Sequence, residues 1–272
     1  MLRTFRAPFR HLCTISLLGA LCHSAAAAPA GCKRDIVVAS SQVGRAMTVG
    51  ADNTVRGAVR DFLDLVSERT GCRFQYAPVS RARAWMMVAS GRADIMPAAS
   101  QTHERDQFAQ FVATHQVRPM LISLDPSQPA VGSIDELLRT RLHVAVVRSY
   151  DFGMAYRNAV GELKRQGRLH SVTDPQAVAA LLESGGVHTA LLPPSAFADA
   201  AELNQLAPRL QTRALPEMPH MRIGFYLSTS SLDDADRLLL QEAIRKAVAS
   251  GAYADAMRRH YPRWALADVR SN

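Results

Sequence analysis

Apolar and polar positions in the first part of the chain follow two different periods. Three short apolar runs of the kind found in buried strands alternate with two segments in which apolar side chains recur every three or four residues, as on one face of a helix. In chain order these five stretches are 35–40, 54–71, 72–79, 80–91 and 93–99. Gly71 and Gly91 are suited to end the two helices. The order predicts a parallel sheet covered by helices.

The stretch ASQTHERDQFAQF follows the third strand and has the pattern of a helix start. Ser100 and Thr102 are residue types that cap helices, and Phe108 and Phe111 are three positions apart. Arg105 falls in the first turn, where backbone N–H groups point outward and the helix dipole is positive. Ligands of parallel α/β sheets bind outside the carboxyl ends of the strands, and this turn lies at such an end.

The pattern then changes at an extended run, 117–125, and a Pro- and Gly-rich segment, 126–132, which we predict to be a crossover into a second α/β unit. The elements of that unit are helices at 133–140, 152–167 and 174–186, and strands at 142–147 and 188–194. A second candidate crossover lies in 213–230, and two helices, 232–251 and 252–264, end the chain. Two crossovers would leave a cleft between two lobes.

The first 28 residues have the pattern of a secretory signal peptide. Arg3, Arg6 and Arg10 precede a short apolar stretch, and a run of small residues follows, with cleavage expected between Ala27 and Ala30. The apolar stretch is about half as long as the ~20 residues that a membrane span needs.

Removal of this leader changes the charge of the chain. The leader holds three of the 32 Lys and Arg residues and no acidic residue, so the mature chain has 29 basic and 24 acidic residues and a net charge of +5. No block of five or more basic residues occurs, which argues against nucleic-acid binding. The seven mature histidines show no metal-binding spacing, and no nucleophile elbow or phosphate-binding loop is present, so we expect no metal, cofactor or catalytic residue.

Two cysteines, Cys32 and Cys72, remain after the leader is removed, and in an exported protein they are expected to form a disulfide. Each precedes a predicted strand, so neighbouring parallel strands would bring them to the same edge of a sheet. Closing a loop of about 40 residues would stabilise the fold by at most roughly 4 kcal/mol. The alternative is two separate structural thiols.

The segment RARAWMMVASGRADIMPAASQTHER resembles the first lobe of the family 3 extracellular solute-binding proteins. In that family a helix of the form R-A-x-x-x-x-x-x-G-x-x-D precedes a strand and then S-x-T-x-E-R. The helix at 54–71 is similar to the family's first helix, and the last two helices are similar to its terminal pair around a glycine. The resemblance covers nearly all of the mature chain.

This resemblance implies a two-lobed α/β periplasmic-binding-protein fold with a double-crossover hinge and a central ligand cleft. We expect residues 33–122 and 222–272 to form the first lobe and residues 123–221 the second. The family's grip on a ligand carboxylate falls on Ser100, Thr102 and Arg105, because a guanidinium can donate two parallel N–H bonds to a carboxylate. The alternative is an exposed Arg105 that pairs with a neighbouring acidic residue.

The second lobe departs from the amino-acid-binding members of the family. They place a Gly/Ser-Thr turn after one strand and an aspartate, which holds the ligand ammonium, after a later one. Here Arg148, Ser149 and Tyr150 occupy the turn, and Pro193 and Pro194 stand where the aspartate is expected. A non-amino organic anion or a modified solute is therefore favoured, with Arg148 as a second anion contact or else an exposed loop residue.

Three further residues are candidates for the lining of the expected cleft. Ser41 and Gln42 follow the first strand and could hydrogen-bond a ligand, or they could simply be polar turn residues. Trp85 lies in the middle of a helix beside apolar residues, so we predict a core position.

The resemblance implies a periplasmic protein that captures a small organic anion or amino-acid-like solute and passes it to an inner-membrane ABC permease. We expect a monomer, because the sequence has no heptad pattern and no long exposed apolar stripe. A ligand-sensing or accessory protein of the same fold, read by a membrane receptor or enzyme, is the second possibility. A few relatives are dehydratases, and that third possibility would need a Glu or His in the cleft.

Overall fold

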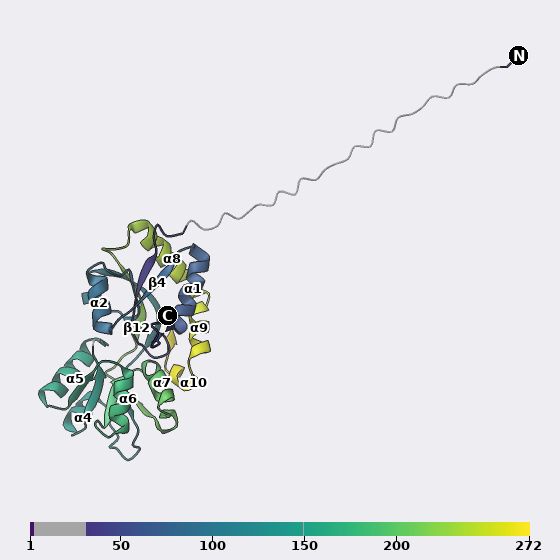
Figure 1. Ribbon diagram of the computed structural model, residues 1–272. Helices are drawn as coiled ribbons and strands as arrows, with labels where there is room; N and C mark the ends of the chain where they lie inside the picture. The colour runs from purple at the N-terminus through teal and green to yellow at the C-terminus, as the bar shows by residue number, and fades with distance from the viewer. Residues whose placement is uncertain (3–30, 149) are drawn as a thin grey trace.

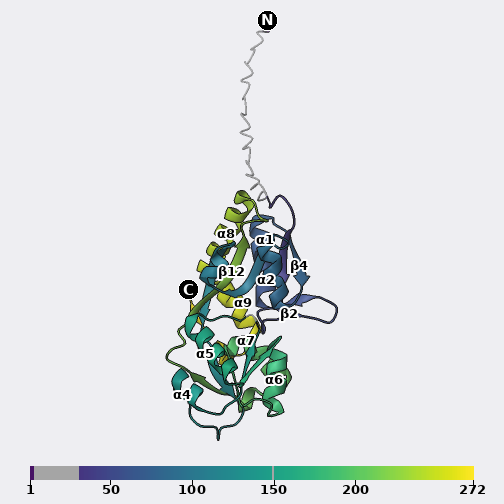
Figure 2. The ribbon, with the colours of Figure 1, turned by 90° about the vertical axis from the view of Figure 1, so that its left-hand side faces the viewer.

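The computed structural model describes residues 1–2, 31–148 and 150–272, and its elements are built on two sheets that lie one above the other in Figure 1. Apart from its first two residues, the predicted signal peptide lies outside the described part of the chain, and so does Ser149. The two sheets belong to two helix-covered units, seen from a second side in Figure 2.

The first sheet is mixed and has six strands. In spatial order they are β13 (Arg270–Ser271), β6 (Ala109–Val117), β12 (Met221–Ser228), β5 (Ile95–Ser100), β1 (Ile36–Ser40) and β4 (Phe74–Pro78). Strand β1 pairs in parallel with β4 and β5, whereas β12 runs antiparallel to β5 and β6. A small hairpin, β2 (Thr48–Val49) and β3 (Val55–Arg56), stands beside this sheet.

The second sheet has five strands. In spatial order they are β11 (Gln211–Ala214), β7 (Met120–Ser123), β10 (Thr189–Leu192), β8 (Val144–Val147) and β9 (Leu169–Val172). Strand β8 pairs in parallel with β9 and β10, and β7 is antiparallel to β10 and β11.

Helices cover both faces of each sheet. The first sheet carries α1 (Ala58–Thr70), α2 (Arg81–Ala89), α3 (His103–Asp106), α8 (Asp234–Ala249), α9 (Ala252–His260) and α10 (Arg263–Leu266). The second carries α4 (Ile134–Arg139), α5 (Met154–Arg165), α6 (Pro175–Glu183), α7 (Pro194–Leu203) and the 3-10 turn η1 (Ala207–Arg209).

Side-chain alternation explains why the central strands are apolar throughout. In β8, Val144 and Val146 pack with α5, whereas Ala145 and Val147 pack with α6 and α7 on the other face. A strand that is buried on both faces exposes neither set of side chains, so a continuous apolar run is expected there.

The chain crosses from one sheet to the other twice, and Asp268 contacts a residue in each of the two crossing segments. The first lies between β6 and β7 at Arg118, and the second lies between β11 and β12 and contains His220. Asp268 accepts two bonds of 2.8 Å from the Arg118 guanidinium and lies 3.2 Å from the His220 ring. The prediction of a first crossover at 126–132 was wrong, because β7 already belongs to the second sheet.

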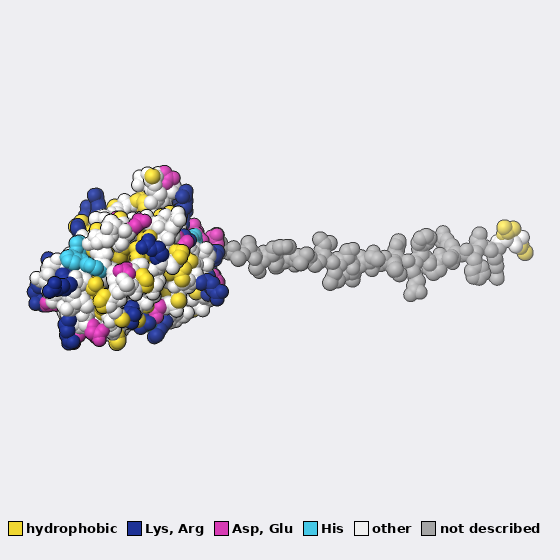
Figure 3. Space-filling model, turned by 90° about the horizontal axis from the view of Figure 1, so that it is seen from below, with side chains coloured by type: hydrophobic (Ala, Val, Ile, Leu, Met, Phe, Trp, Pro, Cys, Tyr) yellow, Lys and Arg dark blue, Asp and Glu magenta, His cyan; other side chains and the backbone are white. Residues whose placement is uncertain are grey.

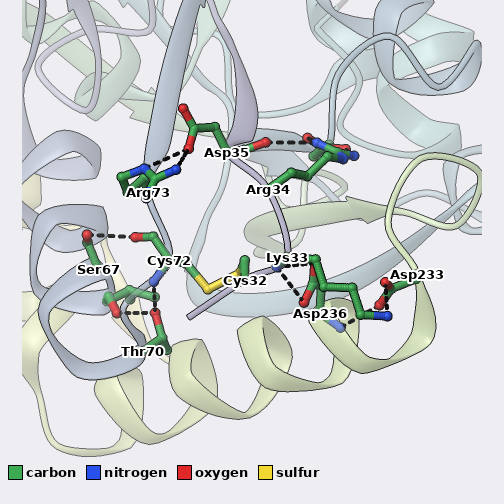
Figure 4. Close-up of a disulfide and its surroundings, with 12 residues drawn as sticks. Cys32, Lys33, Arg34, Asp35, Ser67, Thr70, Cys72, Arg73, Asp233 and Asp236 are labelled. Atoms are coloured by element: carbon green, nitrogen blue, oxygen red, sulfur yellow. Dashed lines mark hydrogen bonds and ion pairs between the residues drawn. A yellow bond between two sulfur atoms is a disulfide. The ribbon is translucent and has the colours of Figure 1, made fainter. Parts of the chain in front are cut away.

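The predicted pairing of Cys32 and Cys72 is confirmed, with a Cα–Cα distance of 4.6 Å. Figure 4 shows the bond beside the end of α1, where the Ser67 hydroxyl donates to the Cys72 carbonyl. Because β1 and β4 run in parallel, the disulfide lies at their amino ends, at the opposite end of the strands from the predicted cleft.

The helix predicted after Ser100 is only one turn long. Helix α3 ends at Asp106, and β6 begins at Ala109, so Phe108 and Phe111 are not on one helix face. Phe111 instead packs against Tyr226 of β12, because the whole of β6 pairs with that strand. Tertiary pairing therefore overrides the local spacing.

Strand β9 and helix α7 are among the elements that were absent from the prediction. Strand β9 is short and polar, as an edge strand often is. Helix α7 begins at the second of two adjacent prolines: Pro193 is its cap, and Pro194 occupies its first turn, where a missing N–H costs nothing.

Candidate functional site

The carboxyl ends of the parallel strands of both sheets face each other across a hollow of about 50 Å³. Among the residues that line it are Arg81, Ala98, Ser100, His115, Tyr150, Asp151, Pro193 and Ser195. A second hollow of about 360 Å³ lies beside it and is lined from both units by Ser41, Gln42, Arg81, Val147, Thr173 and Asp174, among others. Such strand ends are the usual ligand position in α/β folds.

The one-turn helix α3 is held in place at its first residues. The Thr102 hydroxyl accepts a bond of 3.3 Å from the backbone N–H of Arg105, so Thr102 is the cap that the sequence predicted. The Tyr226 hydroxyl accepts from the Thr102 N–H and donates to Asp106 at 2.8 Å. Ser100 is the last residue of β5 and not a helix cap.

The Arg105 guanidinium lies between β5 and an aromatic ring. Its Nη1 donates to both the carbonyl and the hydroxyl oxygen of Ser100 at 2.8 Å, and the group lies 4.1 Å above the ring of Trp85. Burial lowers the pKa of Arg105, and the nearby Asp151 carboxylate opposes this shift. The half-buried Trp85 ring thus supports the Arg105 guanidinium through a cation–π contact and helps to fix its orientation.

Ser100 also connects the two units. Its hydroxyl donates a bond of 2.5 Å to the backbone carbonyl of Asp151, which follows β8 in the second unit. The Asp151 carboxylate is bound by Arg157 at 2.8 Å and by the Gly153 N–H at 2.9 Å. The Ser100 hydroxyl therefore accepts from the Arg105 guanidinium and donates to a backbone carbonyl of the second unit, so its hydrogen is already used.

Arg81, the first residue of α2, is the functional candidate that sequence reasoning missed. Its side chain is buried in the cleft, where Nη2 donates to the Ala98 carbonyl at 2.8 Å and Nη1 to the Ser41 hydroxyl at 3.3 Å. Burial lowers the pKa of Arg81 to about 10, so it stays protonated at neutral pH. The sequence signal was an arginine directly after Ser80, a residue of the type that caps helices, at the end of a strand.

Tyr150 faces Arg81 from the second unit. The Arg81 guanidinium lies 5.5 Å from the centre of its ring. The Tyr150 hydroxyl is buried and finds no hydrogen-bond partner among the described residues, and burial raises its pKa. Tyr150 therefore closes the middle of the cleft, as its predicted position in the loop after β8 suggested.

Of the other predicted ligand contacts, two line the larger hollow and one does not line either hollow. Ser41 and Gln42 line the larger hollow, but the Gln42 amide donates to Asp199 of α7 at 3.2 Å and accepts from the Val49 N–H. Arg148 is exposed and lines neither of the two hollows. Ser149 lies outside the described residues, and the binding role of this whole set stays a prediction.

Close backbone contact joins the loop after β1 to α7. Gly44 has a φ of +48°, and a Cβ placed there would lie 2.5 Å from the Ser195 carbonyl oxygen. Only glycine fits this left-handed position and this close approach. Gly44, Gln42 and Ser100 are thus among the residues through which the two units touch, and Trp264 of α10 adds a bond of 3.1 Å to Glu202 of α7.

Three histidines that are far apart in sequence meet at the other end of the second unit. His143, His170 and His188 lie at the starts of β8, β9 and β10, with 2.9 Å between the His143 and His170 rings. Figure 3, seen from that end, shows histidine side chains gathered on the surface. Even so, the described part of the chain contains no group of three ligands arranged to hold a metal ion.

A family model for the bacterial extracellular solute-binding proteins, family 3, matches residues 36–263. The chain belongs to this family. Its members are binding proteins, which agrees with a cleft lined from two units. A comparison with curated protein sequences gives no match.

Solved structures of this family have the same fold. The arginine-, lysine-, histidine-binding protein ArtJ from Geobacillus stearothermophilus is 16% identical, with 85% of this chain and 97% of that chain covered and a TM-score of 0.69. AbpA of Streptococcus pneumoniae, solved bound to L-arginine, is 18% identical over 83% and 94% of the chains, with a TM-score of 0.67.

A histidine kinase sensor domain with similarity to periplasmic binding proteins also matches, at 17% identity over 84% of this chain and 98% of that chain, with a TM-score of 0.69. This family 3 member therefore has the two-lobed periplasmic-binding-protein fold that the sequence predicted. In its described residues, no helix combines the length and apolar character needed to cross a membrane.

Proposed function

We propose that this family 3 protein captures a small carboxylate-bearing solute between two lobes, one built on each sheet, and delivers it to a membrane transporter from the periplasm. The observation that carries the proposal is the orientation of Arg105 by Ser100 and Trp85 at the carboxyl end of β5. A guanidinium held in this way can donate to a planar carboxylate.

Binding requires the lobes to separate first. The hollow beside Ser100 measures only about 50 Å³, and the Ser100 hydroxyl in it is already bonded to the Asp151 carbonyl of the second unit. A solute oxygen would replace the Asp151 carbonyl at the Ser100 hydroxyl, and closure would then bury the solute. Hinge motion at the two passages near Arg118 and His220 would supply the opening.

The experiment is a thermal-shift screen of the oxidised protein without its leader. Amino acids, monocarboxylates, dicarboxylates and polyamines are tested against the wild type, Arg105→Ala and the control Arg83→Ala, whose side chain is exposed on α2. A solute that binds only the folded state should stabilise it by about 2.7 kcal/mol at a hundredfold excess over Kd. We expect carboxylates to stabilise the wild type and the control but not Arg105→Ala.

Two results would contradict the proposal. Stabilisation by polyamines alone would show that the cleft prefers cations. An Arg105→Ala variant that responds as the wild type does would remove Arg105 from the site. The solute should also be recovered unchanged after long incubation, because chemical conversion would indicate a lyase on this fold.

A sensing role is the second candidate, favoured by the similarity to the histidine kinase sensor domain. Deletion of the gene distinguishes the two roles once a solute is known. Loss of uptake of that solute supports delivery to a transporter. Normal uptake with loss of the transcriptional response to the solute supports sensing.

A further inference from the structure

We infer that Arg81 is a second anion contact in the same cleft and that the solute is a small dicarboxylate. This inference rests on the proposed function, because Arg105 binds the first carboxylate. Arg81 is the one described residue that lines both hollows between the lobes, so it stands at the centre of the cleft and not at its margin.

The Arg81 guanidinium has donors to spare. Two of its five N–H groups are accounted for by neutral acceptors, the Ala98 carbonyl and the Ser41 hydroxyl. The Nε atom is buried without a hydrogen-bond partner, and no described carboxylate forms an ion pair with this side chain. A charge that is 92% buried is normally paired, so the geometry lacks an anion.

The group opposite Arg81 supports the same ligand. The buried Tyr150 hydroxyl has no partner among the described residues, and a phenol can donate to a carboxylate. One anionic group placed between Arg81 Nε and the Tyr150 hydroxyl would satisfy both of these buried polar atoms. Rotation of the Tyr150 ring away from Arg81 would make the room.

Arg81 and Arg105 are fixed to the same strand end. Arg81 donates to the carbonyl of Ala98, and Arg105 donates to the carbonyl of Ser100, two residues further along β5. Ala98 has a φ of +49° and lies where β5 bulges against β12, a left-handed conformation of the kind found at functional sites. The two guanidinium groups are therefore anchored to neighbouring carbonyls of one strand end, and we assign one end of a short diacid to each of them.

The acidic residues around the cleft already have partners. Asp151 is bound by Arg157 and the Gly153 N–H, and Asp174 caps α6 by accepting from the Ala177 N–H at 2.9 Å. Pro193, which has no charged or hydrogen-bonding side chain, lines the smaller hollow from the second unit. The lining therefore favours a second negative charge on the solute over a positive one.

The test compares acids that differ by one charge. Succinate, glutarate and adipate are titrated calorimetrically against their monoamides, which keep the length but carry one carboxylate. We expect the best diacid to bind the wild type at least about tenfold more tightly than its monoamide, as a charge-assisted contact in a buried site should. In Arg81→Met this ratio should fall to about one, while Arg83→Met, on the exposed side of α2, should keep it.

The controls separate folding from recognition. Arg81→Met removes an uncompensated buried charge, so its melting temperature without solute should equal or exceed that of the wild type. Arg81→Lys retains the charge and should keep part of the diacid preference. A wild type that binds the monoamides as tightly as the diacids overturns the inference whether or not the variants fold.

The outcomes also separate this inference from the proposed function. Monocarboxylates that bind in an Arg105-dependent way, with no preference for diacids, would leave the proposed function intact and overturn the role of Arg81. A diacid preference that Arg81→Met leaves unchanged would also overturn it. If none of the diacids binds the wild type while another carboxylate of the thermal-shift screen does, only the role of Arg81 is overturned; if no carboxylate of that screen binds, both proposals fail.

Discussion

The two walls of the cleft differ in chemistry and in how they are held. The first-sheet wall presents two guanidinium groups, Arg81 and Arg105, anchored to carbonyl groups of β5. The second-sheet wall meets them with the Tyr150 ring and the Asp151 backbone carbonyl. The difference indicates that the first wall recognises charge and that the second wall covers the solute.

Removal of the disulfide in the first unit should have the largest effect on stability and no effect on solute affinity. Replacing Cys32 and Cys72 by serine should lower the free energy of unfolding by up to about 4 kcal/mol, the chain-entropy limit for a loop of 40 residues. Solute affinity should stay the same, because the bond lies at the amino ends of β1 and β4 and the cleft at their carboxyl ends. Urea unfolding and calorimetry measure the two quantities, and a parallel loss of affinity would contradict this separation.

The first wall also contains a buried histidine, and its titration should give the next largest effect. Burial lowers the pKa of His115 to about 4, whereas in the unfolded chain it is near the ordinary 6.5. Between these values the unfolded chain binds a proton that the folded protein does not, so stability is lost as the pH falls from 6.5 to 4, by at most about 3 kcal/mol.

Urea unfolding at pH 7 and pH 4 tests this dependence. His115→Phe should remove that part of the pH dependence, whereas His103→Phe, at an exposed position on α3, should keep it. Equal slopes of stability against pH in the wild type and in His115→Phe would rule out a neutral buried histidine.

Contact between the walls can be broken at Gly44. Gly44→Ala should cost about 1 to 2 kcal/mol because of its left-handed backbone, and its Cβ should push α7 away from the loop after β1. Gly167→Ala has the same type of strain, at a φ of +69°, but no atom within 4 Å of its Cβ. Small-angle scattering should show a larger radius of gyration for Gly44→Ala than for the wild type or Gly167→Ala. Equal radii for the three proteins would contradict the predicted separation of α7 from the loop after β1.

The smallest expected effect comes from removing the Tyr150 hydroxyl, and it is compared with the removal of the Tyr76 hydroxyl, which is also buried but lies outside the cleft. Tyr150→Phe and Tyr76→Phe each remove a buried hydroxyl without a partner, so each should gain up to about 1 kcal/mol in stability. Only Tyr150→Phe should weaken diacid binding, because Tyr76 lies on β4 against Arg60, outside both hollows. Calorimetry that finds equal diacid affinities for the two variants would remove the hydroxyl from the site.

Local pattern predicted much of the first unit. The segments around β1, β4 and β5 and the helices between them have strong periodicity, and parallel pairing of β1 with β4 brought Cys32 and Cys72 together as expected. The cap at Thr102 was likewise predictable, because capping is a contact between near neighbours in sequence. Strand β6 was mistaken for helix because its partner, β12, lies more than a hundred residues later.

The sequence by itself determined the alternation of strands and helices, the disulfide and the turn that carries Arg105, since each depends on short-range spacing or on residue type. It could not rank Arg81 above Arg83, which are two positions apart in the same basic helix start. A helix turns about 100° per residue, so the two side chains leave α2 on nearly opposite sides. Only the tertiary structure, by packing Tyr150 and the β5 bulge around one side of α2, decided that Arg81 is buried in the cleft and Arg83 is exposed.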